Sequence, residues 1–190
     1  MKNAGMIALT GLGLCLAVLL AVPAVAQMAS QHSHTQMHQT HQHDMARMPG
    51  LQGRDTTTDE VGDMAAMFRQ FPSLSRQVTL LPNGIRTETS TADPALRDAL
   101  LRHVIGMIDR VETGRDPKVR IQSPTLDIIF ARRDRLQTQI DLTDTGVVVV
   151  QTSDDPELVA ALQTHAAEVS DMAARGMHAV HEAMARRMRQ

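Results

Sequence analysis

The sequence predicts an α+β protein in which a helix–hairpin–helix unit occurs twice and forms a four-stranded antiparallel sheet with helices on one face. Residues 78–114 align without a gap on residues 140–176, and ten of the 37 positions are identical. Average amino-acid usage would give roughly two or three identities by chance, so the match indicates an internal repeat. Because a single two-stranded hairpin is only marginally stable, we expect the hairpins of the two units to pair into one sheet.

The first 26 residues are predicted to be a secretory signal peptide. They begin with a positive charge, residues 6–22 are almost wholly apolar, and Ala-Val-Ala at 24–26 precedes the expected cleavage point. A transmembrane helix is the alternative, but the apolar run is short and stops at Pro23. Cleavage would remove Cys15, the only cysteine. The rest of the chain therefore suits an oxidising compartment, and we expect a periplasmic or secreted protein.

Residues 27–54 are predicted to form a disordered tail, because they contain few aliphatic residues that could build a core. The candidate metal ligands of this tail are Met28, His32, His34, Met37, His38, His41, His43, Met45 and Met48. Imidazole binds Cu(II), Ni(II) and Zn(II), whereas thioether sulfur favours Cu(I). We therefore expect the tail to bind copper as Cu(I) or Cu(II), and the alternative is a polar linker without a ligand. In composition the tail resembles the Met/His-rich extensions of periplasmic copper-tolerance and copper-transport proteins.

The first unit of the repeat is expected over residues 55–116. Apolar residues at helical spacing end at Pro72, and Pro-Asn-Gly at 82–84 is a strong hairpin-turn signal. Asp93 followed by Pro94 is typical of the start of a helix. The expected elements are a helix over residues 61–71, strands over 78–81 and 85–90, and a helix over 94–113.

The second unit is expected over residues 117–178 and repeats this order. Ser123 begins its first helix, a Gly-containing turn at 144–146 joins its strands, and Asp155 begins its last helix. The expected elements are a helix carrying Leu126, Ile129 and Phe130, strands over 140–143 and 147–152, and a helix carrying Leu158, Leu162 and Val169.

Each unit contains a pattern of the form Gly…Ser-Asp-Asp-Pro…His. The stretches are NGIRTETSTADP, followed by His103, and TGVVVVQTSDDP, followed by His165. The first departs from the pattern at Ala92, where the second has Asp154. On these residues the chain resembles small exported bacterial proteins of unassigned function that carry such a duplicated unit. The resemblance implies a duplicated hairpin–helix fold and no particular activity.

His103 and His165 occupy equivalent places on the apolar faces of equivalent helices, so a twofold arrangement could make them face one another. Met107 follows His103 by four residues, and Met172 follows His165 by seven, which places each thioether on the same helical face as its imidazole. Two His with one or two Met would suit copper, and paired axial ligands would suit a non-covalent haem. The alternative is a pair of structural imidazoles that pack at the interface of the repeats.

The C-terminal extension, residues 179–190, is predicted to continue as a helix after a turn at Gly176. One helical face collects soft ligands, namely Met177, His181, Met184 and Met188, with His178 three residues before His181. Such a set suits Cu(I). The alternatives are a helix that packs its methionines on the domain, or one that binds a partner.

Composition excludes several functional classes. The formal charge is −2 and aromatic residues make up 2% of the chain, which argues against nucleic-acid binding. No nucleophile–base pair or recognised catalytic motif is present, so we expect no enzyme. The leading hypothesis is an exported protein that sequesters or delivers copper, without a membrane span after signal cleavage. The second is a non-enzymatic module that binds an envelope protein, and the third is a non-covalent haem protein.

Overall fold

The computed structural model describes residues 48–189. The predicted signal peptide and most of the Met/His-rich tail lie outside these residues. In chain order the elements are η1 (Pro49–Leu51), α2 (Thr58–Arg69), η2 (Phe71–Ser73), β1 (Ser75–Leu81), β2 (Gly84–Ser90), α3 (Pro94–Glu112), α4 (Thr125–Ala131), η3 (Arg133–Arg135), β3 (Gln137–Leu142), β4 (Gly146–Thr152), α5 (Pro156–Arg175) and α6 (Met177–Arg187).

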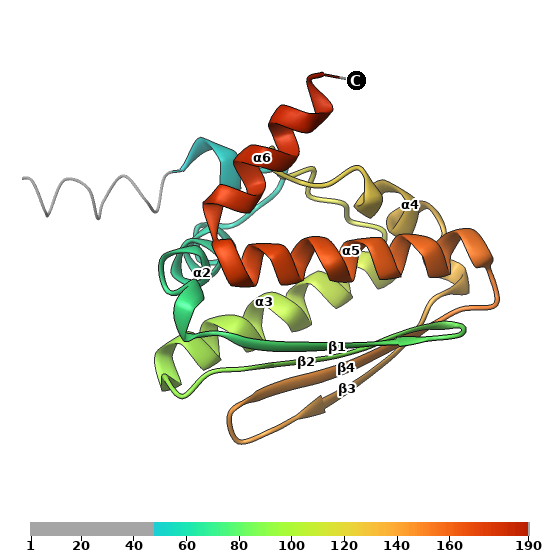
Figure 1. Ribbon diagram of the computed structural model, residues 1–190, viewed down its shortest axis with the longest axis horizontal. Helices are drawn as coiled ribbons and strands as arrows, with labels where there is room; N and C mark the ends of the chain where they lie inside the picture. The colour runs from blue at the N-terminus through green and yellow to red at the C-terminus, as the bar shows by residue number, and fades with distance from the viewer. Residues whose placement is uncertain (1–47, 190) are drawn as a thin grey trace, which may run out of the picture. The chain divides into compact units, whose positions relative to one another are not determined.

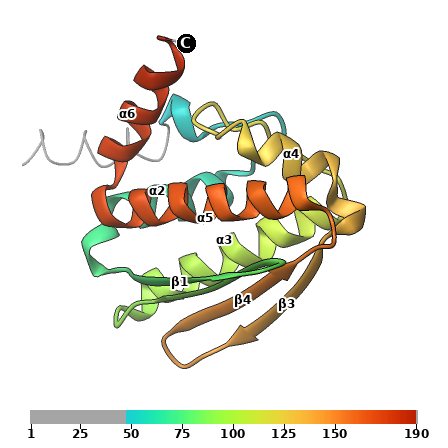
Figure 2. The ribbon, with the colours of Figure 1, turned by 45° about the vertical axis from the view of Figure 1, so that its right-hand side comes forward.

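The predicted α+β class is confirmed. The strands form one antiparallel sheet in the order β1-β2-β4-β3, so the two hairpins join through their second strands. Figures 1 and 2 show α3 and α5 lying along the same side of this sheet, with α2 at one end. None of the described helices is long and apolar enough to cross a membrane.

The repeat found in the sequence is also present in the pairing of the strands. β4 begins and ends 62 residues after β2, and α5 begins 62 residues after α3. In the β2–β4 ladder Thr87 lies opposite Val149, its own equivalent in the second unit. The neighbouring pairs, Arg86 with Val150 and Glu88 with Val148, are equivalent to each other when 62 is added to the residue numbers of β2. The two units are therefore related by a pseudo-twofold axis that passes between Thr87 and Val149.

Glycine is required where the two units meet. A Cβ at Gly84 would lie 1.9 Å from the carbonyl oxygen of Gln151, and a Cβ at Gly146 would lie 2.0 Å from that of Thr89. These distances are far shorter than any real carbon–oxygen contact between non-bonded atoms. The matched glycines thus allow the second hairpin strands to pair along their whole length.

The predicted helix starts are present as side-chain caps. Asp93 accepts hydrogen bonds from the backbone N–H groups of Ala95 and Leu96, and Asp155 caps α5 in the same way. Gly176 has a φ of 57°, which ends α5 and lets α6 leave in a new direction. Local chemistry therefore sets the ends of both long helices.

The folded part begins earlier than predicted. Residues 48–54 were assigned to the tail, yet Leu51 is fully buried in a small cluster with Val61 and Ala65 of α2. Met48, predicted as a tail ligand, packs its side chain against this cluster. The boundary at residue 55 was therefore placed too late, because one buried leucine after a proline carries too little periodic signal to detect.

Candidate functional site

A cavity of about 320 Å³ lies between α2, α3, α5 and the helical face of the sheet. Protein interiors are normally packed with few voids larger than a water molecule, whereas binding pockets range upward from roughly 300 Å³. A space of this size inside a domain of 142 described residues therefore marks a candidate binding site.

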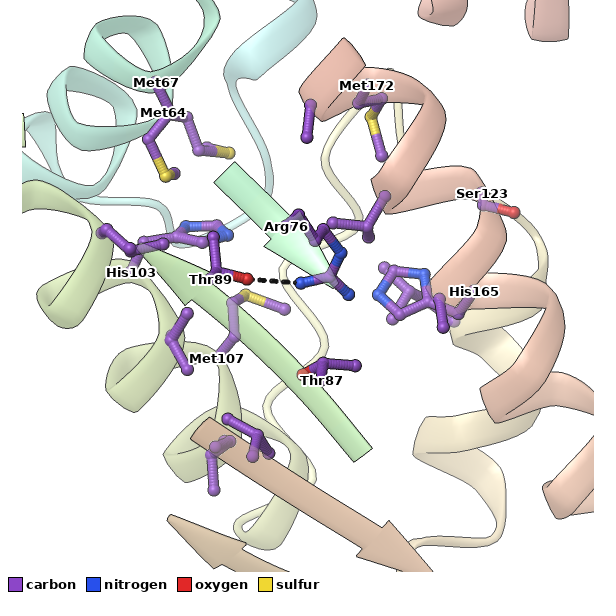
Figure 3. A pocket seen from close by; sticks show the side chains of 18 of the residues that line it. Met64, Met67, Arg76, Thr87, Thr89, His103, Met107, Ser123, His165 and Met172 are labelled. Carbon is purple, nitrogen blue, oxygen red and sulfur yellow. Dashed lines mark hydrogen bonds between the residues drawn. The ribbon is translucent and has the colours of Figure 1, made fainter. Parts of the chain in front are cut away.

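The walls of the cavity are mainly apolar and unusually rich in methionine. Thioethers come from three helices, with Met64 and Met67 on α2, Met107 on α3 and Met172 on α5 (Figure 3). Methionine is flexible and polarizable, so such walls adapt to the shape of a guest molecule. Other apolar contacts come from both helices and strands, namely Phe68, Phe71, Ile85, Leu100, Val104, Val147, Val149 and Val169.

Both histidines singled out by the repeat line this one cavity, His103 from α3 and His165 from α5 (Figure 3). Burial lowers the pKa of His103 below its usual value, so this imidazole is neutral at pH 7. The nearby carboxylates of Asp63 and Glu60 act on this pKa in the opposite direction, and burial outweighs them. The pair therefore contributes polar atoms to the cavity, and its His103 member adds no charge.

The carboxylate of Glu168, which does not line the cavity, lies near His165. Nδ1 of His165 lies 3.7 Å from Oε2 of Glu168, and Ser123 donates a hydrogen bond of 2.6 Å to the other oxygen of that carboxylate. Although burial acts in the opposite direction, the nearby imidazole and hydroxyl lower the pKa of Glu168. The Nδ1–Oε2 distance is too long for a hydrogen bond, and within the described residues both Nδ1 of His165 and Oε2 of Glu168 are buried without a hydrogen-bond partner.

The sequence analysis missed Arg76, which projects into the cavity from β1 (Figure 3). Its Nη1 donates a 2.7 Å hydrogen bond to Oγ1 of Thr89, whereas its Nε is buried without a partner. Burial lowers the pKa of Arg76 to about 10, so the guanidinium still carries its charge at pH 7. A signal was available, because Arg76 alternates with Val78 on the apolar face of the strand.

In the described part of the chain the predicted metal ligands fall into separate groups. His103, Met107 and His165 line the cavity, whereas the ligands predicted on α6 do not. On α6 the inward residues are Ala179 and Val180, whereas His178 and His181 are exposed and Met188 is 82% exposed. Met177 and Met184 are half-buried. Within residues 48–189 no three His, Cys, Asp or Glu side chains are grouped as a metal site. The remaining predicted ligands, Met28 to Met45, lie outside the described residues.

No protein-family model, curated protein or solved structure matches this chain. The resemblance to small exported bacterial proteins therefore stays a prediction.

Proposed function

We propose that this protein is a binding protein that holds a small, mainly apolar molecule in the cavity between α2, α3, α5 and the sheet. The observation that carries the proposal is a 320 Å³ space with methionine-rich walls between the helices and the sheet. At roughly 30 Å³ per non-hydrogen atom, the share of one water in the liquid, this space suits a guest of about ten such atoms. A haem is several times larger, so the volume does not favour the haem hypothesis.

The chemistry of the walls supports an organic guest over a metal cation. No carboxylate lines the cavity among the described residues, and Arg76 places a positive charge there. A copper ion between the two imidazoles would meet that charge in a medium of low dielectric constant, where repulsion is strong. Burial of an apolar guest instead gains about 25 cal/mol for each Å² removed from water.

A titration with 1-octanol tests the proposal. The protein used is residues 27–190, which retain every described element, with ¹³C-labelled methionine methyl groups observed by NMR. We expect saturable shifts at Met64, Met107 and Met172, which line the cavity, and none at the exposed Met188. Val169→Phe fills the cavity and should weaken binding at least tenfold.

Val150→Phe is the matched control for the filled cavity. Val150 lies opposite Arg86 in the sheet, on the face turned away from the helices, so its enlargement should leave octanol binding unchanged. Shifts that do not saturate, or equal weakening by both substitutions, would remove the support for an internal binding site. Those results would favour the interaction-module hypothesis, in which His103 and His165 are structural.

Copper binding is a separate proposal that rests on the composition of the tail. Nine His and Met residues between positions 28 and 48 offer ligands for both copper oxidation states. We expect residues 27–190 to bind Cu(I) and Cu(II) more tightly than micromolar, and to lose this binding when residues 27–47 are deleted. Calorimetry with Zn(II) as the comparison ion measures it, and equal affinity with and without the tail would refute the proposal.

A further inference from the structure

We infer that the guest of the cavity is an amphipathic anion, an aliphatic carboxylate of about eight to ten carbons, whose head group pairs with Arg76. This inference rests on the proposed binding function and adds the charge and chemical class of the ligand. Three properties of Arg76 support this inference. Within residues 48–189 it forms no ion pair, one edge of its guanidinium donates no hydrogen bond, and it is the only Asp, Glu, Lys or Arg among the described residues that line the cavity.

Arg76 is half-buried, and it lacks the partners that a cation shielded from water needs. Within residues 48–189 it forms no ion pair, and its one hydrogen bond is the donation from Nη1 to Thr89. Arg110, whose side chain is buried, shows the usual solution, because Glu60 and Asp55 neutralise it and backbone carbonyl groups accept its remaining protons. A buried charge without an anion is costly to maintain, so Arg76 is poised to receive one.

The free edge of Arg76 has the geometry that a carboxylate recognises. Nε and Nη2 form one side of the planar guanidinium, and neither donates a hydrogen bond to a described residue. Two parallel N–H donors bind the two oxygens of a carboxylate at once. Thr89, directly opposite Arg76 in the β1–β2 ladder, holds Nη1 and thereby fixes the plane of the group.

The rest of the cavity favours a long apolar body with a single charged end. Arg76 is the only Asp, Glu, Lys or Arg among the described lining residues, and the walls around it are thioether, aliphatic and aromatic. In the second unit its equivalent, 62 positions later, is Thr138. Among its described lining residues the cavity therefore has one cationic group, which gives the charged head of a guest one place to bind.

Comparing octanoate with 1-octanol tests this inference, because the two share a chain length and differ in charge. Residues 27–190 should bind octanoate at least tenfold more tightly than octanol at pH 7. Arg76→Met should abolish this preference while leaving octanol affinity within about twofold, since the alkyl body keeps its contacts. Arg86→Met is the matched control, because Arg86 lies on the opposite face of the same hairpin and should retain the preference.

A second measurement needs no variant and guards against misfolding of Arg76→Met. The ¹⁵N–¹H resonance of the Arg76 Nε should move much further on addition of octanoate than on addition of octanol, since only the carboxylate offers a negative charge and two oxygens to the Nε–Nη2 edge. The anion inference is wrong, while the binding function stands, if octanol binds and octanoate binds no more tightly. The same conclusion follows if octanol binds and the Nε resonance does not move on addition of octanoate. If neither compound binds, the binding function itself is wrong.

Discussion

Replacing Leu158 with alanine should lower the free energy of unfolding by about 2–5 kcal/mol. Leu158 is fully buried on α5, in the cluster that also contains Ile85, Phe130 and Leu162. Its truncation loses the transfer free energy of the removed methyl groups and leaves a hole that rigid neighbours fill only in part. Leu158 does not line the binding cavity, so the variant tests the core separately from the site. Urea denaturation followed by circular dichroism measures the change.

Leu142→Ala is the control for this prediction. Leu142 has 58% of its side chain exposed on β3, so the same chemical change should alter the free energy of unfolding by less than about 0.5 kcal/mol. Equal losses for the two variants would show that burial on α5 does not determine stability here.

Replacing Arg110 with alanine should cost about 3 kcal/mol, the lower end of the range for breaking a buried ion pair. Arg110 lies on α3 with only 4% of its side chain exposed. It donates 2.7 Å and 3.0 Å hydrogen bonds to the two carboxylate oxygens of Glu60 on α2, and a 2.8 Å bond to Asp55. The cluster therefore links α2 to α3. We expect a stability loss at the lower end of the range because the carboxylates of Glu60 and Asp55 remain partly exposed to water.

The pH dependence of stability gives a second test of the Arg110 cluster. Hydrogen bonding from Arg110 lowers the pKa of Glu60 from 4.5 to about 2. The carboxylate therefore stabilises the fold fully above pH 4.5, and this contribution is lost as pH falls toward 2. The difference in stability between the parent protein and Arg110→Ala should be constant near pH 7 and shrink between pH 4.5 and 2.

Arg115→Ala is the control, since Arg115 is about half exposed and pairs with Asp109 on the surface. Exposed pairs contribute little, so this substitution should change stability by less than about 0.5 kcal/mol. A loss from Arg110→Ala no larger than the loss from Arg115→Ala would contradict the proposed role of the cluster.

Much of the fold was predictable because its signals are local and occur twice. The Asn83-Gly84 turn, the helix starts at Asp93 and Asp155, and the break at Gly176 each depend on one or two residues and their immediate backbone. The repeat added a long-range constraint, because matched hairpins imply a symmetric sheet. The observed order β1-β2-β4-β3 keeps this symmetry, with the second strand of each hairpin at the centre.

The candidate site was predictable only in part. The repeat indicates that His103 and His165 could face one another in a twofold arrangement, and both line the cavity. Their role as ligands or as structural residues stays a prediction. Arg76 was missed because it lies at a position where the two units differ, with Thr138 as its equivalent. Identity between the repeats therefore gives no indication of Arg76, the one charged side chain among the described lining residues.

The sequence by itself determined the repeat, the turns and the helix ends, since these follow from backbone preferences of neighbouring residues. Tertiary structure alone decided that α3 and α5 lie far enough apart on the sheet to leave a cavity, and that Arg76 lines it with a buried Nε. It also decided that α6 turns Ala179 and Val180 inward instead of its Met/His face. Burial depends on which distant parts of the chain pack against a residue. The spacing of apolar residues predicts burial only where it marks a single apolar face of the helix.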